Sequence, residues 1–306
     1  MSSSLLKSSD PRVWRGVLSQ YDKAINALCS SKAKRKRAGR GSKRKISDEA
    51  SSDQEFPTLD AWYFNELPRY VTERGVDKER WLTLEEVKKI VKWKLMRGKF
   101  RPRLMQLVSS NEPATVIAVT KASNQKLPDI ETAIHELTAL KGVGPATASA
   151  ILQALAPGTV PFMSDEAMGA LSNLGPISYT EKHYSKFLDQ LKKKCQELNR
   201  KEFGQNVWTP DLVEKALWIE AICNRFNIEI PKPGLETAEA DLADESSAAP
   251  IPAEQGMVNT FEKTGLNPPL LSTDPLDINP LDPYSLILAP NSDSGSHVDK
   301  KVKLCP

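Results

Sequence analysis

The stretch between residues 134 and 165 constrains the fold of this chain more than any other. A Leu-Lys-Gly-Val-Gly-Pro run at residues 140–145 separates two segments in which apolar residues recur at helical spacing. Gly142 and Gly144 permit the positive φ that a tight turn between helices needs. Pro145 suits the first position of the second helix, where its missing N–H costs nothing. The pattern predicts two short helices joined by a Gly-Val-Gly turn.

Such a turn can bind an anion. Glycine lets a ligand approach the backbone closely, and the first N–H groups of the second helix have no partner within that helix. A DNA phosphate suits the site, because phosphate contacts position a protein on DNA without reading its sequence. The alternative is a helical hairpin whose glycines only allow close packing. The predicted DNA contacts here are Lys141, Gly142, Val143, Gly144, Ala146 and Thr147.

Residues 134–152 resemble the helix-hairpin-helix motif of the base-excision DNA glycosylases. The extended run at residues 160–163 and the Ser-Asp-Glu that follows also resemble this superfamily, whose members place an aspartate here to support chemistry at the sugar. Across residues 55–228 the chain looks most like the Amun-type nuclear proteins, which have a glycosylase-like domain and no settled activity. The resemblance implies an all-α, helix-hairpin-helix glycosylase-like domain, with Asp165 as the candidate catalytic residue.

The chain departs from this superfamily at two places. Bifunctional glycosylases carry a lysine nucleophile near the start of the second hairpin helix, where this chain has Ala146 and then Thr147. Neither residue can form a Schiff base, so lyase chemistry by that route is not expected. The Asp-Thr-His or Asp-Val-His run of many members is replaced by Asp-Glu-Ala at residues 165–167. A structural alternative stays open as well, since either Ser164 or Asp165 can cap the helix that begins at Glu166.

The N-terminal part combines a predicted helix with a basic run. Residues 10–29 have an Asp-Pro start and an apolar stripe at helical spacing, and we expect this helix to pack on the main domain. Residues 30–55 break the pattern, with nine basic residues and no acid between Lys32 and Lys45, and we expect a disordered loop. Its clusters indicate nuclear import, hence a nuclear location and import receptors as partners, and the alternative is a solvated loop. The import residues are Lys34, Arg35, Lys36, Arg37, Lys43, Arg44 and Lys45.

A second basic region, residues 92–103, holds six basic residues together with Trp93 and Phe100. Gly98 and Pro102 mark a helix end and a turn. Basic and aromatic residues interleaved on a loop are typical of nucleic-acid-binding proteins. The alternative is a solvated helix end, where cations complement the helix dipole. The predicted phosphate contacts are Arg97, Lys99, Arg101 and Arg103.

The pattern predicts one helical domain over residues 56–228. Its aromatic-rich segment, residues 60–70, can stack on a flipped base or pack in the core, and the spacing on one face favours the core. The Thr-Leu-Glu-Glu run at residues 83–86 and the Ser-Tyr-Thr-Glu run at residues 178–181 are capping boxes that begin helices. A last helix follows Thr209-Pro210, and Trp218 lies one residue off its apolar stripe, so we expect this side chain at the edge of the packed face.

Charge and composition separate the two ends of the chain. The net charge of +3 is the sum of −8 on residues 233–306 and +11 on the residues before them, and the basic part suits a polyanionic partner. Eleven of the 22 prolines lie between Pro231 and Pro306, and we expect a disordered tail over residues 229–306. Within it, Leu281–Leu288 is a short apolar island that can bind a protein partner or dock on the chain itself.

No cofactor is expected. The four cysteines are far apart, form no Cys-x-x-Cys pair and have no histidine at ligand spacing, which makes structural zinc or an iron–sulfur cluster unexpected. No apolar run approaches the roughly 20 residues of a membrane helix, so no membrane partner is expected either.

Three functions therefore compete. The first is a nuclear DNA-binding protein that keeps the glycosylase-like hairpin without catalysis. The second is a monofunctional base-excision glycosylase that uses Asp165. A pocket of aromatic and polar side chains facing this carboxylate would favour this function. The third is a protein-interaction scaffold that uses the tail.

Overall fold

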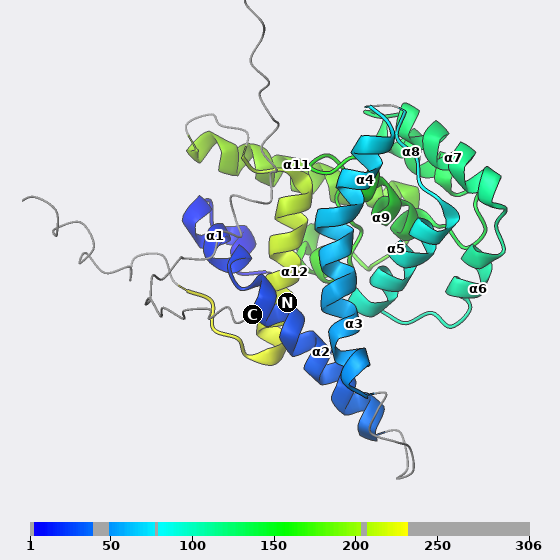
Figure 1. The fold of residues 1–306 in the computed structure, drawn as a ribbon. Coiled ribbons are helices and arrows are strands. Elements are labelled where there is room, and N and C mark those ends of the chain that lie inside the picture. The colour runs from blue at the N-terminus through cyan, green and yellow to red at the C-terminus, as the bar shows by residue number, and fades with distance from the viewer. Residues whose placement is uncertain (1–2, 39–48, 77–78, 203–206, 232–306) are drawn as a thin grey trace, which may run out of the picture.

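The computed structural model describes residues 3–38, 49–76, 79–202 and 207–231, and these residues contain helices and connecting segments without a strand (Figure 1). The all-α prediction is confirmed for this part of the chain, whereas the tail from residue 232 onward lies outside it. The helices are α1 (Pro11–Leu18), α2 (Tyr21–Ala38), α3 (Glu49–Ala61), α4 (Leu67–Arg74), α5 (Leu84–Arg97), α6 (Leu104–Ser109), α7 (Pro113–Gln125), α8 (Ile130–Leu137), α9 (Pro145–Leu155), α10 (Asp165–Ala170), α11 (Glu181–Lys201) and α12 (Pro210–Phe226), with 3-10 turns η1 (Leu5–Lys7) and η5 (Ser172–Leu174) and a π-helical turn η3 (Trp62–Glu66).

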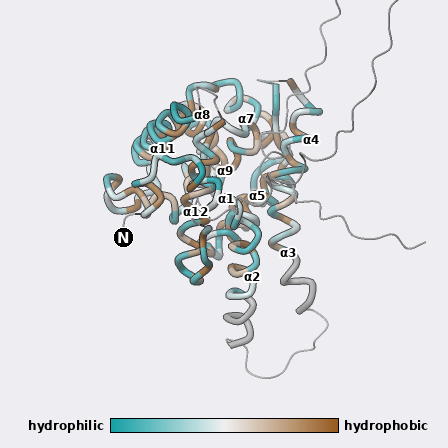
Figure 2. Tube along the Cα trace, turned by 90° about the vertical axis from the view of Figure 1, so that its left-hand side faces the viewer, coloured by the Kyte–Doolittle hydropathy of each residue, from teal (hydrophilic) through white to brown (hydrophobic). Residues whose placement is uncertain are grey.

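Helix α12 lies at the centre of the molecule and packs against α1, α2, α10 and α11 (Figure 1). Trp218 is fully buried, so the predicted place at the edge of an apolar stripe is wrong for this residue. A stripe is expected only when one side of a helix faces solvent, and every residue of α12 between Asp211 and Glu220 is buried. In Figure 2, hydrophilic residues dominate the outer turns of α8 and α11, which lie around this interior.

The N-terminal residues form two helices instead of the single helix predicted over residues 10–29. Asp10 caps α1, and the predicted stripe is buried against α12 through Trp14 and Val17. Glu220 on α12 anchors the preceding residues, because its carboxylate accepts hydrogen bonds from the Leu5 amide at 2.9 Å and from the Ser4 hydroxyl at 2.7 Å.

Helix α2 continues to Ala38 and α3 begins at Glu49, so the loop predicted over residues 30–55 is wrong at both of its ends. The two helices lie side by side and extend beyond the main body (Figures 1 and 2). Residues 34–37, the first import cluster, therefore stand on the last turn of α2. The second cluster, residues 43–45, lies outside the described residues.

The aromatic segment at residues 60–70 packs largely in the core, as its spacing predicts. Tyr63 is buried and stacks on Trp93 of α5, with ring centroids 3.8 Å apart. Asp60 joins three elements, because its carboxylate accepts hydrogen bonds from the Trp93 indole at 2.7 Å and from the Tyr21 hydroxyl at 2.5 Å. The predicted capping box of Thr83 is also present at the start of α5.

Arg97 ends α5 in the interior, not on the surface. Its guanidinium lies 3.4 Å from the carboxylate of Glu214 on α12, and both side chains are 1% exposed. It also stacks over the ring of Trp218 at 4.0 Å. The prediction that Arg97 contacts a DNA phosphate is therefore corrected: the spacing of basic residues could not reveal a partner 117 positions away.

Glu214 has a second partner in Ser164, whose hydroxyl donates a hydrogen bond of 2.5 Å to the carboxylate. Burial raises the pKa of Glu214, with Arg97 acting in the opposite direction. The pair thus holds together the end of α5, the start of α10 and the middle of α12.

We predict that Arg97→Met lowers the free energy of unfolding by about 3–5 kcal/mol at pH 8, because it leaves the Glu214 carboxylate buried without a cation. A carboxyl group whose folded pKa is raised contributes stability that is present at low pH and lost as pH rises through that pKa. The deficit should therefore be smaller at pH 5 than at pH 8 in urea titrations. The double variant Arg97→Met/Glu214→Gln is the control and should lose this pH dependence; an equal deficit at both pH values in the single variant would contradict the prediction.

Candidate nucleic-acid interface

The predicted helical hairpin is present. Helices α8 and α9 pack against each other, and Gly144 and Pro145 occupy the N-cap and first position of α9. The inner faces of both helices, including Ile134 and Ile151, are fully buried. The turn between them is braced by Asn111, which follows α6: its side chain accepts a hydrogen bond from the Lys141 amide at 2.8 Å and donates one to the Lys141 carbonyl at 3.0 Å. No local pattern in the sequence indicates this contact.

The two glycines of the turn have different roles. Gly142 has a φ of +79°, and a Cβ added there would lie 2.9 Å from the Cβ of Leu107. Gly144 has a φ of −102°, so the prediction of a positive φ is right for Gly142 and wrong for Gly144. A Cβ on Gly144 would meet no heavy atom within 4 Å. The chain's own packing explains Gly142, whereas Gly144 faces open space.

The turn offers backbone groups more than side chains. The side chains of Val143, Ala146 and Thr147 are buried, so these predicted contact residues can reach a ligand mainly through their backbone. Within the described part of the chain, the amides of Gly144 and Ala146 make no recorded hydrogen bond, whereas the Thr147 amide binds the Gly144 carbonyl at 2.8 Å. The Lys141 side chain is exposed beside them.

Asp165 is the first residue of α10, and it does not cap the helix. Ser164 does, because its hydroxyl accepts a hydrogen bond from the Ala167 amide at 3.3 Å. The Asp165 carboxylate accepts a hydrogen bond from the Tyr179 hydroxyl at 2.6 Å and pairs with the Lys99 ammonium at 2.8 Å. Of the two capping candidates, the structure therefore assigns the cap to Ser164 and leaves Asp165 with its side chain among polar groups.

These partners shift each other's protonation. The hydrogen bond to Asp165 raises the pKa of Lys99, which keeps the ammonium charged. Burial and the hydrogen bond to Asp165 raise the pKa of Tyr179, which keeps the phenol protonated. Tyr179 was expected only as part of a capping run; the cap of α11 is the next residue, Thr180, and this frees Tyr179 to reach Asp165.

The hairpin turn, Asp165 and the loop after α5 line one cavity of about 240 Å³. Lys94, one turn before the end of α5, also lines it, and burial lowers the pKa of its ammonium. Three of the predicted contact residues, Lys141, Val143 and Arg103, do not line the cavity; Val143 is buried, whereas Lys141 and Arg103 are exposed. The predicted contact residues that do line it, with Asp165, are Lys99, Arg101, Gly142, Gly144, Ala146 and Thr147, and Arg97 closes it from the interior.

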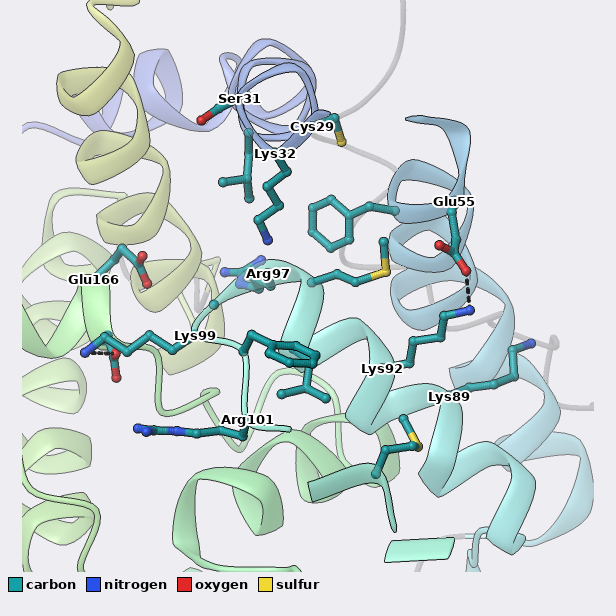
Figure 3. Close-up of a pocket in the computed structure, with 18 of the residues that line it drawn as sticks. Cys29, Ser31, Lys32, Glu55, Lys89, Lys92, Arg97, Lys99, Arg101 and Glu166 are labelled. Carbon is teal, nitrogen blue, oxygen red and sulfur yellow. Dashed lines mark ion pairs between the residues drawn. The ribbon is translucent and has the colours of Figure 1, made fainter. Parts of the chain in front are cut away.

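A larger groove of about 1640 Å³ adjoins this cavity and shares Lys99, Arg101 and Asp165 with it. Figure 3 shows the groove between α2, α3 and α5, with the ion pair of Lys99 at one end and the pair of Glu55 with Lys92 at the other. The side chain of Lys32 points from α2 into this space.

No protein-family model, no curated protein and no solved structure matches this chain. Within the described ranges there is no group of three or more His, Cys, Asp or Glu side chains that could hold a metal ion. In the same ranges no helix has both the length and the apolar character needed to cross a membrane. A function for this chain therefore has to be inferred from the geometry of the cavity.

We predict stability effects of different size for two adjacent residues. Ser164→Ala should lower the free energy of unfolding by about 1–2 kcal/mol, because it removes a helix cap and a partner of the buried Glu214. Asp165→Asn should change it by less than about 1 kcal/mol, since its ion pair with the exposed Lys99 is screened by water. Urea unfolding followed by circular dichroism measures both, and an equal loss in the two variants would show that Asp165 is structural.

Proposed function

We propose that this chain is a nuclear DNA-binding protein whose helical body is a helix-hairpin-helix, glycosylase-like domain. The observation that carries the proposal is the shared cavity, because three segments far apart in the sequence meet there: the turn before α9, the start of α10 and the loop after α5. One segment offers backbone amides, one a carboxylate and one a set of cations. Together they suit the sugar–phosphate backbone of DNA.

The charges around the cavity favour one placement of a DNA phosphate and its neighbouring sugar. A phosphate is favoured at the Gly144 and Ala146 amides, where the N-terminus of α9 and Lys141 are both attractive. A phosphate is disfavoured beside Asp165, because both groups are negatively charged. The ammonium of Lys99 pairs with this carboxylate but does not remove the repulsion. The sugar next to that phosphate would then lie against the carboxylate. Arg101 and Arg103 remain exposed for neighbouring phosphates.

Phe100 adds a feature that charge alone does not explain. It is 72% exposed on the loop between α5 and α6, and basic residues flank it on both sides. An exposed phenyl ring gains contact area when it stacks on a nucleobase, and such stacking contributes about 1–3 kcal/mol per base. We assign Phe100 this role in the proposed interface.

The nuclear location rests on the basic run between Lys32 and Lys45. Its first cluster is carried on the end of α2, which extends beyond the body, where an import receptor would have access (Figure 1). In this proposal, import receptors and DNA are the partners of the basic part of the chain.

We predict that Gly144→Ala weakens DNA binding by about tenfold or more, because the added methyl group fills the space that a phosphate would occupy and blocks hydrogen bonds to it. Stability should stay within about 0.5 kcal/mol of the unchanged protein. The measurement is fluorescence anisotropy of the full chain with duplex DNA over a salt series, in which loss of one phosphate contact lowers the salt slope by about 0.9.

Two other glycine variants make this test specific. Gly169→Ala is the matched control, since it also has open space around its Cβ position but does not line the cavity, and it should bind DNA normally. Gly142→Ala should instead destabilise the fold by more than about 1 kcal/mol, because its φ is positive and its Cβ would clash. Unchanged affinity and salt slope in Gly144→Ala would remove the turn from the proposed interface.

A second function, monofunctional DNA glycosylase, is favoured by one observation: Ser164 takes the cap, and Asp165 lines the cavity with Tyr179 and Lys99 on its two oxygens. In this reaction the C1′–N bond breaks and its electron pair leaves with the base. The carboxylate would stabilise the oxocarbenium-like transition state, and water then adds to C1′ and loses a proton. The base must leave the stack first. Ala146 and Thr147 provide no amine for a covalent intermediate.

We predict for this second function that Asp165→Asn lowers the rate of base release by at least about 100-fold while DNA affinity stays within about threefold. The assay incubates the full chain with duplexes that each contain one damaged or mismatched base, and then cleaves abasic sites with alkali. Tyr179→Phe is the companion variant and should show a smaller loss, because it keeps the carboxylate but removes one hydrogen bond to it. Tight binding without abasic sites on any duplex would leave DNA binding as the function.

A further inference from the structure

We propose that the groove between α2, α3 and α5 is a docking site for a segment of the chain's own tail, the apolar island Leu281–Leu288 with its acidic flanks. This docking does not depend on the proposed DNA binding. Its regulatory consequence does, because the groove and the DNA cavity share residues.

The groove has the size and floor of a peptide-binding site. Its volume of about 1640 Å³ exceeds the roughly 300–1,000 Å³ of small-molecule pockets. Aliphatic, methionine and phenylalanine side chains from α2, α3, α5, α6 and α12 form the apolar part of its lining. They are Leu28, Phe56, Leu95, Met96, Met105 and Phe226, and Phe100 joins them from the loop after α5. Such a surface gains most from apolar side chains of a partner, at about 25 cal/mol per Å² buried.

The rim of the groove is basic. Besides Arg97, which pairs with Glu214 in the interior, seven Lys and Arg side chains line it against four Asp and Glu side chains. Each of these carboxylates pairs with a neighbouring cation: Lys88 with Glu85, Lys92 with Glu55, Lys99 with Asp165 and Arg225 with Glu166. The lining therefore carries a net positive charge. An acidic segment would complement it.

The tail offers a segment with both properties. Between Lys263 and Lys300 the chain has five acidic residues and no Lys or Arg, and the island lies in the middle of this stretch. Asp277 and Asp282 stand on either side of its first residue, and five of its eight residues are Leu, Ile or Tyr. Apolar side chains would meet the floor while the carboxylates meet the rim.

The chain also leaves the folded body within reach of the groove. Arg225 and Phe226, at the end of α12, line it, and the described residues end five positions later at Pro231, whose carbonyl lies beside Gly16 of α1. Five residues span at most about 17 Å. About 50 residues separate Pro231 from the island. A flexible chain of that length has a root-mean-square span of about 40 Å, which is enough to reach the groove from α1. Tethering at this distance gives a high effective concentration of the segment.

Nucleic acid is the poorer occupant of this groove. A phosphate backbone, unlike the apolar island, would leave the aliphatic and methionine side chains of the lining uncovered. Phe56 is 2% exposed, so its ring cannot be a platform for stacked bases. Phe100 is an exposed ring of the lining, but it stands between Lys99 and Arg101, the cations that the groove shares with the DNA cavity. Because a docked tail would cover Lys99, Arg101 and Asp165, it would compete with DNA for the adjoining cavity.

Photo-crosslinking of the full chain tests the docking. Benzoylphenylalanine in place of Met105 should crosslink to the peptide that contains residues 281–288, in the monomer fraction, with at least fivefold more product than the same group in place of Val76, which is 75% exposed away from the groove. Leu286→Asp/Ile287→Asp in the tail should reduce this product at least fivefold. Ala248→Asp/Ala249→Asp adds the same charge elsewhere in the tail and should leave it unchanged.

Equal crosslinking from positions 105 and 76, or a product that Leu286→Asp/Ile287→Asp does not reduce, would overturn the docking. A product found only between two copies would also overturn it and would make the groove an intermolecular interface. For the competition, Leu286→Asp/Ile287→Asp should strengthen binding to duplex DNA at least threefold relative to Ala248→Asp/Ala249→Asp. Crosslinking without any DNA binding would uphold the docking and reject the proposed function, whereas DNA binding without crosslinking would do the reverse.

Discussion

The buried pair of Arg97 and Glu214 is the interaction on which the rest of the structure depends. It joins the last residue of α5 to the central helix α12, and through Ser164 it reaches the start of α10. The loop that carries Lys99, Phe100 and Arg101 begins directly after Arg97, and Asp165 directly follows Ser164. One desolvated ion pair thus fixes the starting points of two of the three segments that form the cavity. Its position in the interior separates it from the exposed cations, which remain available for a ligand.

The central helix explains why so many charged side chains are buried in this fold. A helix that is surrounded by other helices must carry its polar residues into the interior, where each needs a partner. Glu214 has Arg97 and Ser164, and Glu220 has the N-terminal residues of the chain. Lys215 lies 4.0 Å from the ring centre of Tyr21, and burial lowers its pKa to about 8. These contacts fix the positions of η1, α2 and α5 around α12.

Local signals predicted much of this arrangement. The hairpin turn, the capping box at Thr83 and the proline at the start of α9 all act within a few residues, so the sequence displays them directly. Arg97 and Trp218 were misplaced because their burial depends on contacts between α5 and α12, which no short pattern contains. Tyr179 was missed for a related reason: its partner Asp165 lies across a connection whose path is set by tertiary packing. The candidate carboxylate followed from a resemblance, while its hydrogen-bond partners required the fold.

Natural selection should act differently on Gly142 and Gly144, because only one of them is required by the fold. At Gly142 the backbone conformation and the neighbouring α6 exclude any side chain, so a change there is removed whatever the protein binds. At Gly144 the fold tolerates a methyl group, and only something that approaches from outside could exclude it. Descendants of this chain that lost the ligand would therefore keep glycine at position 142 and accumulate alanine or serine at position 144. In such descendants, the excess of substitutions at position 144 over position 142 would grow with the time since the loss of a ligand.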